Sequence, residues 1–204
     1  MAPKLKTSPR KQPRQKRSQE TVDAILVATA QVLVRHGYEG ANTNRIAEAA
    51  GVSVGALYQY FPSKEALVTA LIERHMESMW EIIVAAAAKV AEAPVEVAVR
   101  EVIGAIFAAH EVQPKLSRVL REQVPRVGAL RQMNEINQRC IQLVLVNLEA
   151  RHAQIVPKDR SLAAYVVVHT VDALAHVALE RHDEGQSRAL LEETCQVVLR
   201  YLHG

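Results

Sequence analysis

Aromatic residues and cysteine are scarce in this 204-residue chain. Phe, Trp and Tyr together make up 4% of the residues, and the only two cysteines are Cys140 and Cys195. Their spacing matches no metal or redox motif, and both lie within segments of helical apolar pattern. We therefore expect buried free thiols in a reducing compartment, with a redox switch as the alternative.

Strand patterns and an uninterrupted apolar run are also missing. The apolar residues, 49% of the chain, are mostly Ala, Val, Leu and Ile at helical spacing. The most apolar stretch, 161–179, contains His169, Asp172 and His176, which a membrane-spanning helix tolerates poorly. No apolar run follows the basic residues near the start, so we expect no secretory signal. The sequence predicts an all-α cytoplasmic protein without a membrane span.

Prolines and glycines divide the chain into segments of helical length. The breaks fall near Gly40, Gly51, Pro62, Pro94, Pro114, Pro125, Pro157 and Gly185. We expect about nine helices, spanning 18–36, 43–50, 54–60, 63–91, 95–112, 115–123, 127–152, 159–183 and 187–203.

Residues 42–64 hold two short helical segments around a glycine. Asn42 is a good N-cap for the first segment, and Gly51 follows it where a left-handed residue is favoured. Ser53 can cap the second segment, which Pro62 ends after barely two turns. This pattern is typical of a helix-turn-helix, whose second helix enters the major groove of DNA.

The second segment has an unusual outer face. Leu57 and Phe61 lie one turn apart and should be buried, which leaves a face without Glu or Lys. Small residues let a backbone approach closely, Gln can bond an adenine edge, and phenols reach phosphates or the thymine methyl. The alternative is an exposed helix with incidental tyrosines. The outer residues are Val54, Gly55, Ala56, Tyr58, Gln59 and Tyr60.

These residues closely resemble the DNA-binding domain of the TetR/AcrR family of transcriptional regulators. About 60 residues, from Ser18 to near Ser78, carry the resemblance. The matching runs are Gly37-Tyr38, Thr43-Asn44-Arg45-Ile46-Ala47-Glu48-Ala49-Ala50-Gly51-Val52-Ser53, Gly55-Ala56-Leu57-Tyr58-Gln59-Tyr60-Phe61 and Ser63-Lys64-Glu65-Ala66-Leu67. The resemblance implies that Thr43 and Lys64 touch phosphate and that the outer residues of the second helical segment face the major groove. We add Arg45 and Ser53 to the expected DNA contacts.

The beginning of the chain is strongly basic. Residues 1–17 contain seven Lys or Arg and no acid, whereas the whole chain has a net charge of only +3. Such an arm can bind phosphates or enter a minor groove, although it is alternatively a solubilising or vector-derived tail. We expect a disordered arm at 1–17, a DNA-binding domain at 18–78 with its helix-turn-helix at about 41–60, and an effector-binding and dimerisation domain at 79–204.

The last two predicted helices point to a dimer. The segment 163–179 is apolar nearly all round, and a helix without a polar face must be covered on all sides. Two such helices from each copy would form an isologous four-helix interface, as the resemblance also implies. A larger monomeric core is the alternative. The apolar face of the final helix comprises Leu190, Leu191, Thr194, Val197, Val198 and Tyr201.

The middle helices are the expected place for an effector pocket, because long helices around an apolar interior often enclose one. We expect the pocket residues to be Met76, Trp80, Phe107, His110, Asn134, Asn137 and His169, with Leu130 also facing inward. His169, Asp172 and His176 share a helical face that could bind a transition metal, although a hydrogen-bonded His–Asp pair is the simpler interpretation. We expect no metal and no cofactor.

The pattern as a whole indicates a regulator and no enzyme, because no nucleophile lies in an activating context. The sequence predicts a ligand-responsive repressor that binds a palindromic operator as a dimer and is released by a small, largely apolar effector. The alternative is a chromosome-organising DNA-binding protein that contacts a protein partner through its C-terminal helices.

Overall fold

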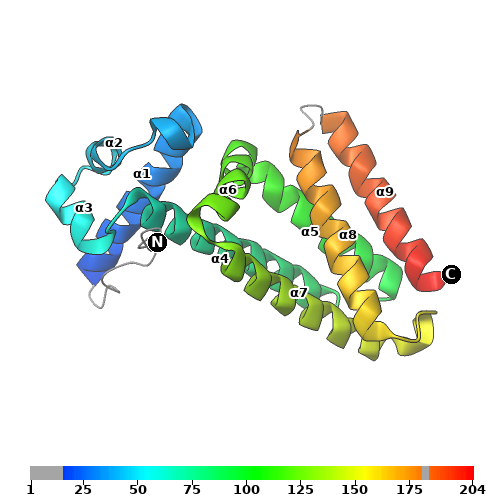
Figure 1. Cartoon of the computed structure of the whole chain (residues 1–204). Helices are drawn as coiled ribbons and strands as arrows, with labels where there is room; N and C mark the ends of the chain where they lie inside the picture. The colour runs from blue at the N-terminus through cyan, green and yellow to red at the C-terminus, as the bar shows by residue number, and fades with distance from the viewer. Residues whose placement is uncertain (1–15, 181–183) are drawn as a thin grey trace, which may run out of the picture. The chain divides into compact units, whose positions relative to one another are not determined.

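The computed structural model describes residues 16–180 and 184–204. Within them it contains nine α-helices, a single 3-10 turn and no strand, which confirms the all-α prediction (Figure 1). The elements are α1 (Lys16–Gly40), α2 (Thr43–Ala49), α3 (Val54–Tyr60), α4 (Lys64–Lys89), α5 (Val95–Val112), α6 (Pro114–Val127), α7 (Leu130–Ala150), η1 (His152–Gln154), α8 (Arg160–Glu180) and α9 (Glu184–His203).

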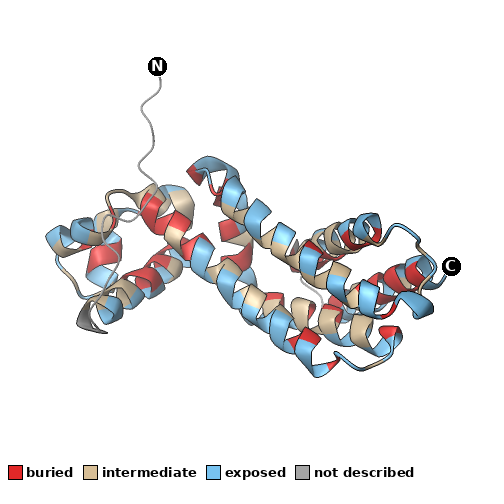
Figure 2. Cartoon of the chain, turned by 90° about the horizontal axis from the view of Figure 1, so that it is seen from below, coloured by how far each residue is buried: buried red, intermediate tan, exposed pale blue. Residues whose placement is uncertain are grey.

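The chain forms two compact units. The first comprises residues up to His75 together with Lys115–Gln132, and the second comprises Met76–Pro114 and Met133–Gly204. The boundary falls inside α4, close to residue 78 where the sequence analysis placed a domain change. The first unit also contains α6, which the sequence analysis had grouped with the C-terminal domain. In Figure 2, buried residues lie along particular faces of the helices, as amphipathic packing requires.

The first unit is built around α1. This helix begins at Lys16, so Lys16 and Arg17 are helical and do not belong to the expected arm; residues 1–15 of that arm lie outside the described part. Its regular path breaks at Gly37, whose φ of 65° and ψ of 178° are not helical. Glycine adopts this positive φ without the clash that a Cβ would cause. The buried side chains of Ile25 and Leu33 contribute to the core of the unit.

Side-chain caps and a glycine turn hold the two short helices α2 and α3. The Asn42 carboxamide accepts a hydrogen bond from the Arg45 amide at 2.9 Å, and the Ser53 hydroxyl accepts one from the Ala56 amide at 3.1 Å. Gly51 has a φ of 67°. The amides of Gly51 and Val52 then donate back into the last turn of α2, at 3.1 and 3.0 Å. The caps and turn predicted for this motif are confirmed.

The end predicted for α6 is wrong. The sequence suggested a break near Pro125, but the helix continues through this proline to Val127. Pro125 is exposed and lies in the last turn, so it removes a single helical hydrogen bond, to the exposed Arg121 carbonyl that water can reach. The helix ends instead at Gly128, with a φ of 72°, and the amide of the following residue donates to Val124 at 3.1 Å.

The second unit has its core between α5, α8 and α9 (Figure 1). Small residues such as Ala163, Ala164 and Ala175 on α8 are fully buried, which lets neighbouring helices approach closely. Val198 on α9 is 1% exposed and lies in this core, so the prediction that it belongs to an intermolecular face is wrong. α8 is long and apolar enough to cross a membrane by length and composition alone, a test that a soluble core helix also passes.

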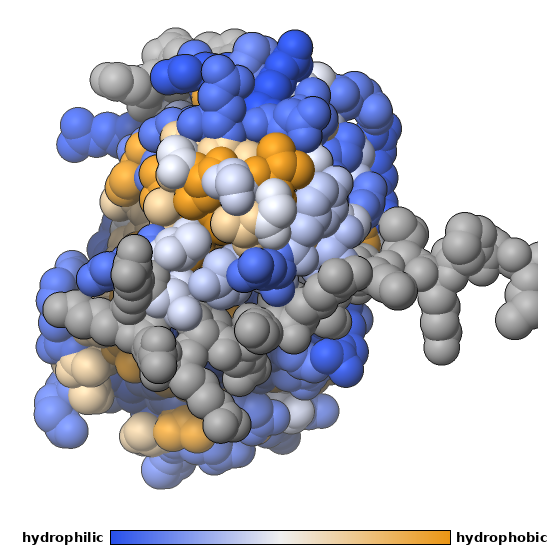
Figure 3. Space-filling view, turned by 90° about the vertical axis from the view of Figure 1, so that its left-hand side faces the viewer, coloured by the Kyte–Doolittle hydropathy of each residue, from blue (hydrophilic) through white to orange (hydrophobic). Residues whose placement is uncertain are grey.

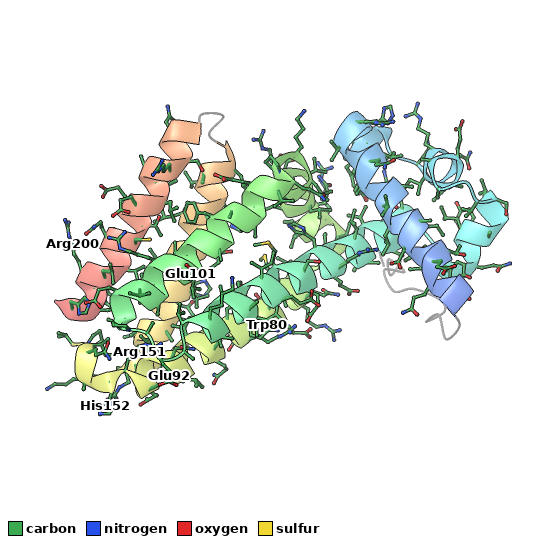
Figure 4. The ribbon with its side chains drawn as sticks, turned by 180° about the vertical axis from the view of Figure 1, so that it is seen from behind. Trp80, Glu92, Glu101, Arg151, His152 and Arg200 are labelled. Atoms are coloured by element: carbon green, nitrogen blue, oxygen red, sulfur yellow. The ribbon has the colours of Figure 1, made fainter. Side chains whose placement is uncertain are left out.

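Arg151, in the second unit, lies at the C-terminal end of α4 (Figure 4). Its buried guanidinium donates to the carbonyls of Val90, Ala91 and Ala93 at 2.6, 2.7 and 3.1 Å, just after α4 ends. The Val90 carbonyl also accepts from the Ala93 amide at 3.1 Å, and a cation is favoured at the negative end of a helix dipole. Arg151 therefore joins the end of α7 to the end of α4 by hydrogen bonds.

Two glycines provide a matched test of this backbone. A Cβ added at Gly51 or at Gly104, within α5, would meet no atom within 4 Å, but only Gly51 has a positive φ. We expect Gly51→Ala to lower the free energy of unfolding by about 1 kcal/mol, whereas Gly104→Ala raises it by about 0.5–1 kcal/mol. Guanidinium unfolding followed by circular dichroism measures both; equal effects would contradict this account.

Candidate nucleic-acid interface

α3 presents one face to the core and the other to solvent. Leu57 and Phe61 are 0% and 1% exposed, whereas Tyr58 is 40% exposed and Gln59 is also exposed. Tyr60 is half-buried at the flank. Figure 3 shows the side of the molecule on which α2 and α3 lie, with apolar and weakly polar side chains gathered between strongly hydrophilic ones. The exposure of Tyr58 and Gln59 agrees with the outward face that the sequence predicted for this helix.

The structure brings two of the predicted DNA contacts together. The Thr43 hydroxyl at the start of α2 lies 3.1 Å from the Tyr58 hydroxyl on α3, and the two share a hydrogen bond. Thr43 is half-buried and Tyr58 exposed, and whichever hydroxyl accepts in this pair keeps its own hydrogen to donate to an approaching phosphate. The bond also fixes the direction of the Tyr58 ring relative to α2.

Arg45 and Ser53 are exposed but already have partners within the unit. The Arg45 guanidinium donates to the Gly40 carbonyl at 2.6 Å, and Ser53 caps α3. Arg45 also borders an open depression of about 340 Å³ between α1 and α2, whose other lining residues are Gln31, Val32, Arg35, His36, Glu48 and Ala49. Both side chains thus have structural roles beside any contact with DNA. Val54, Gly55 and Ala56 lie at the start of α3, the first two exposed.

Lys64, the remaining predicted contact, is bound to the end of α1. Its ammonium donates to the Tyr38 carbonyl at 3.0 Å and lies 4.0 Å from the centroid of the Tyr38 ring. The Tyr38 hydroxyl in turn donates to the Glu65 carboxylate at 3.3 Å. A cation over a phenol face is favourable, so the first turn of α4 and the turn after Gly37 hold each other.

The ionisation of these groups follows from their partial burial. Burial, aided by the negative charge of Glu65, raises the pKa of Tyr38 to about 12. Burial alone would raise the pKa of Glu65. Hydrogen bonds from its own amide, from Ser63 and from Tyr38 outweigh that effect and lower it. Both pKa shifts favour the same pair of ionisation states, in which the neutral Tyr38 phenol donates to the ionised Glu65 carboxylate.

The predicted effector residues do not all face the interior of the second unit. Phe107 and His110 on α5 are buried, and Met76, Asn137 and His169 are half-buried. Asn134 is exposed, so its assignment as an inward residue is wrong, as is that of Leu130. Both lie near the start of α7, and helical periodicity alone did not show which of its faces is covered. Trp80 is half-buried under the Arg139 guanidinium, 4.3 Å from the ring centroid (Figure 4).

The polar residues of α8 divide into two pairs. The His169 ring lies tilted against the Tyr165 ring, at 4.3 Å between centroids. His176 instead hydrogen-bonds the Asp172 carbonyl through Nδ1 at 2.7 Å and lies 4.8 Å from the buried His110 ring. Among the described residues, no group of three or more His, Cys, Asp or Glu could hold a metal ion.

Both cysteines are free in the structure. Cys195 is buried as expected, and Cys140 is half-buried. Burial, followed by the charge of Asp172, raises the pKa of Cys140 to about 11, and burial also raises that of Cys195. A thiol that stays protonated at neutral pH is a poor nucleophile.

Sequence reasoning missed one contact of the turn after Gly37. Arg126 of α6 forms an ion pair with Glu39 at 2.8 Å, and its guanidinium carbon lies 5.8 Å from the Tyr38 ring centroid. The two ends of this pair are 87 residues apart in the chain. No local pattern signals such a contact, because it depends on which face of α6 the tertiary fold turns toward α1.

Two family models match the chain. One, described as bacterial regulatory proteins of the tetR family, matches residues 25–71, which include α2 and α3. The other, described as the tetracyclin repressor-like C-terminal domain, matches residues 94–202, more than half of the chain. The chain belongs to the TetR family of transcriptional regulators. The resemblance seen in the sequence is therefore confirmed, and with it a DNA-binding regulatory role.

Two proteins of known role are similar to this chain over different lengths. The transcriptional activator FasR of Mycolicibacterium smegmatis is 42% identical over 55 residues, which are 27% of this chain and 25% of FasR. The nucleoid occlusion factor SlmA of Haemophilus ducreyi is 30% identical over 141 residues, 64% of this chain and 67% of SlmA. The chain thus spans only a quarter of FasR.

A solved structure supports the fold. The crystal structure of a TetR-family transcriptional regulator from Mesorhizobium loti superposes with a TM-score of 0.76 at 20% identity, covering 93% of this chain and 100% of that one. At this identity the likeness establishes the nine-helix architecture alone.

The pKa of Tyr38 gives a test of the contacts around Lys64. Because folding favours the neutral phenol, its contribution to stability is complete below pH 10 and is lost as the pH rises from about 10 to about 12. We expect Tyr38→Phe to remove the tyrosine that ionises near pH 12 from the ultraviolet titration. The free energy of unfolding should also depend less on pH between about 10 and 12. Loss of a phenol that titrates near pH 10 would contradict the assignment.

Proposed function

We propose that this protein is a ligand-responsive repressor that binds an inverted-repeat operator as a homodimer and is released by a small, largely apolar effector. One observation carries the DNA-binding part: α3 buries Leu57 and Phe61 and leaves Tyr58 and Gln59 facing solvent. A helix held in this way can enter the major groove without losing its core contacts.

In this proposal the side chains of α3 and of the neighbouring helices have different roles in DNA recognition. Gln59 can accept from and donate to an adenine edge, which gives sequence preference. Of the paired Thr43 and Tyr58 hydroxyls, the one that accepts within the pair donates its hydrogen to a phosphate oxygen, and Lys64 adds a charge at the start of α4. The small residues at Gly55 and Ala56 let the helix approach the base edges. Arg45, Ser53, Val54 and Tyr60 border this surface.

The homodimer would form on the outer faces of α8 and α9. Exposed apolar residues follow one stripe of α8, at Leu162, Tyr165, Val166 and Val177, opposite the alanines that fill the core. On α9 the exposed members are Val197 and Tyr201. A monomer gains nothing by exposing such a stripe, and a second copy can cover it isologously. Two recognition helices would then meet successive major grooves, roughly 34–36 Å apart.

The effector would bind within the second unit, where Phe107 and His110 supply apolar and polar buried surface. Met76, Trp80, Asn137 and His169 border that region as half-buried residues. α4 runs through both units, so it is the continuous element between effector and DNA. The ligand can shift DNA binding only by its differential affinity for the two states of the dimer.

A second candidate function rests on one comparison. The match to the nucleoid occlusion factor SlmA runs over 141 residues, well beyond the helix-turn-helix. A chromosome-organising protein that contacts a protein partner through its C-terminal helices would occupy many sites across the genome. A repressor would occupy one or a few promoters, so mapping its occupancy in cells separates the two.

Selection from random duplex DNA tests the operator part of the proposal, and we expect the chain to enrich an inverted repeat. Gln59→Ala should then weaken binding to this DNA by about 1–3 kcal/mol and relax the preference at one position of each half-site. Gln31→Ala is the matched control, because Gln31 is an exposed glutamine on α1 of the same unit. Equal affinity of the Gln59 variant and wild type would show that α3 does not read the bases.

A pair of valines tests the dimer. Val197 on α9 is 48% exposed, and Val146 on α7 is 65% exposed. A buried unpaired carboxylate is costly, so Val197→Asp should yield monomers that bind a single half-site weakly, whereas Val146→Asp should remain dimeric. Light scattering and sedimentation measure the mass of each. A dimeric Val197→Asp variant would remove α9 from the interface. Val198 is unsuitable, because its substitution would disrupt the monomer core.

A further inference from the structure

Four charged side chains from three helices surround one phenol near the end of α1. We call Tyr38, Glu39, Lys64, Glu65 and Arg126 the Tyr38 cluster. Lys64 lies 4.0 Å and Arg126 5.8 Å from the centroid of the same ring. Glu65 accepts from the Tyr38 hydroxyl and Glu39 pairs with Arg126, so the cluster contains two cations and two carboxylates. It connects α1, α4 and α6.

α6 is firmly anchored in the first unit, so Arg126 projects from a fixed helix. Leu116, Leu120, Val124 and Val127 are buried along one face of it. The Ser117 hydroxyl of α6 also lies 3.3 Å from the His75 ring of α4. Gly37, by contrast, breaks the regular path of α1 directly before Tyr38 and Glu39. The Arg126–Glu39 pair therefore joins a rigid helix to a locally irregular turn, and it restrains the turn more than the helix.

Lys64 depends on that turn for its own position. Its ammonium is fixed by the Tyr38 carbonyl and ring, both of which belong to the restrained residues. A lysine side chain has several rotatable bonds, and holding it in one orientation before DNA arrives lowers the entropy lost on binding. With one donor hydrogen used by Tyr38, two remain for a phosphate.

We propose that Arg126 is a positioning residue for the phosphate contact made by Lys64, acting through Tyr38. This inference rests on the proposed function, since it assumes that Lys64 meets a phosphate.

The exposure of the ion pair limits the expected effect. The side chains of Arg126 and Glu39 are 57% and 82% exposed, and exposed pairs are weak. We expect Arg126→Gln to weaken binding to the selected operator about threefold to fivefold at low salt. Glu39→Gln should weaken it by a similar factor, and the double variant should be no worse than either single one.

A second ion pair in the same unit provides the control. Arg74 of α4 pairs with Asp23 of α1 at 2.8 Å with comparable exposure, 46% and 57%, and takes no part in the Tyr38 cluster. Arg74→Gln removes the same charge, so it should have the same effect on general attraction to DNA. If it weakens binding as much as Arg126→Gln does, the loss is merely electrostatic and the proposal fails.

Coupling to Lys64 distinguishes positioning from ordinary destabilisation. In a Lys64→Ala background the further loss caused by Arg126→Gln should vanish, because the group that it positions is gone. Lys64→Ala should also lower the slope of log affinity against log salt by about one, the value for one phosphate contact. A loss from Arg126→Gln that persists undiminished in this background overturns the proposal.

A measurement without DNA separates the positioning role of Arg126 from the proposed operator-binding function. The ε-methylene protons of Lys64, next to an ammonium 4.0 Å from the Tyr38 ring centroid, should show an upfield ring-current shift in proton NMR of the full chain. Arg126→Gln should reduce that shift, and Arg74→Gln should leave it unchanged. An unaltered shift in the Arg126 variant overturns the proposal. A reduced shift in a protein that selects no DNA sequence would retain the positioning and refute the operator function.

Discussion

The burial of Leu57 and Phe61 is the constraint on which the interface depends. α3 has seven residues, far fewer than an isolated helix needs to persist in water. Two fully covered apolar side chains, each contributing about 1.5–3 kcal/mol, together with the Ser53 cap, hold it on the unit. Because so few residues anchor the helix, the remaining positions are free to be small or polar. DNA recognition is possible because stability does not require those side chains.

α6 changes how the first unit is understood. Its buried stripe belongs to the unit that contains α2 and α3, and Arg126 reaches the turn after α1. The unit therefore contains α1, α2, α3 and α6 together with the first part of α4. The end of α1 binds Lys64 through Tyr38. In the second unit Arg151 forms a comparable link, binding the carbonyls that follow α4. Each end of α4 is thus joined to a helix distant in the chain.

α8 carries apolar residues on two faces, one buried and one exposed. Its alanines face α5 and α9 inside the unit, while Leu162, Tyr165 and Val166 remain outside. The sequence predicted that this helix needs cover on all sides, but it could not divide the residues between the two faces. Small side chains suit a close internal contact, and the larger exposed ones are those that the proposed dimer would cover. α9 repeats the division, with Val198 inside and Val197 outside.

The sequence by itself determined the features that local chemistry controls. Asn42, Gly51 and Ser53 act within a few residues of their partners, so the helix-turn-helix and most helix bounds were predictable from spacing alone. Contacts over long separations were decided by the tertiary fold: Arg126 with Glu39, Arg151 with the end of α4, and the exposure of Asn134. Pro125 within α6 belongs with them, because packing of the buried stripe outweighs one missing hydrogen bond. Periodicity shows that a helix has an apolar face, but only packing decides what covers it.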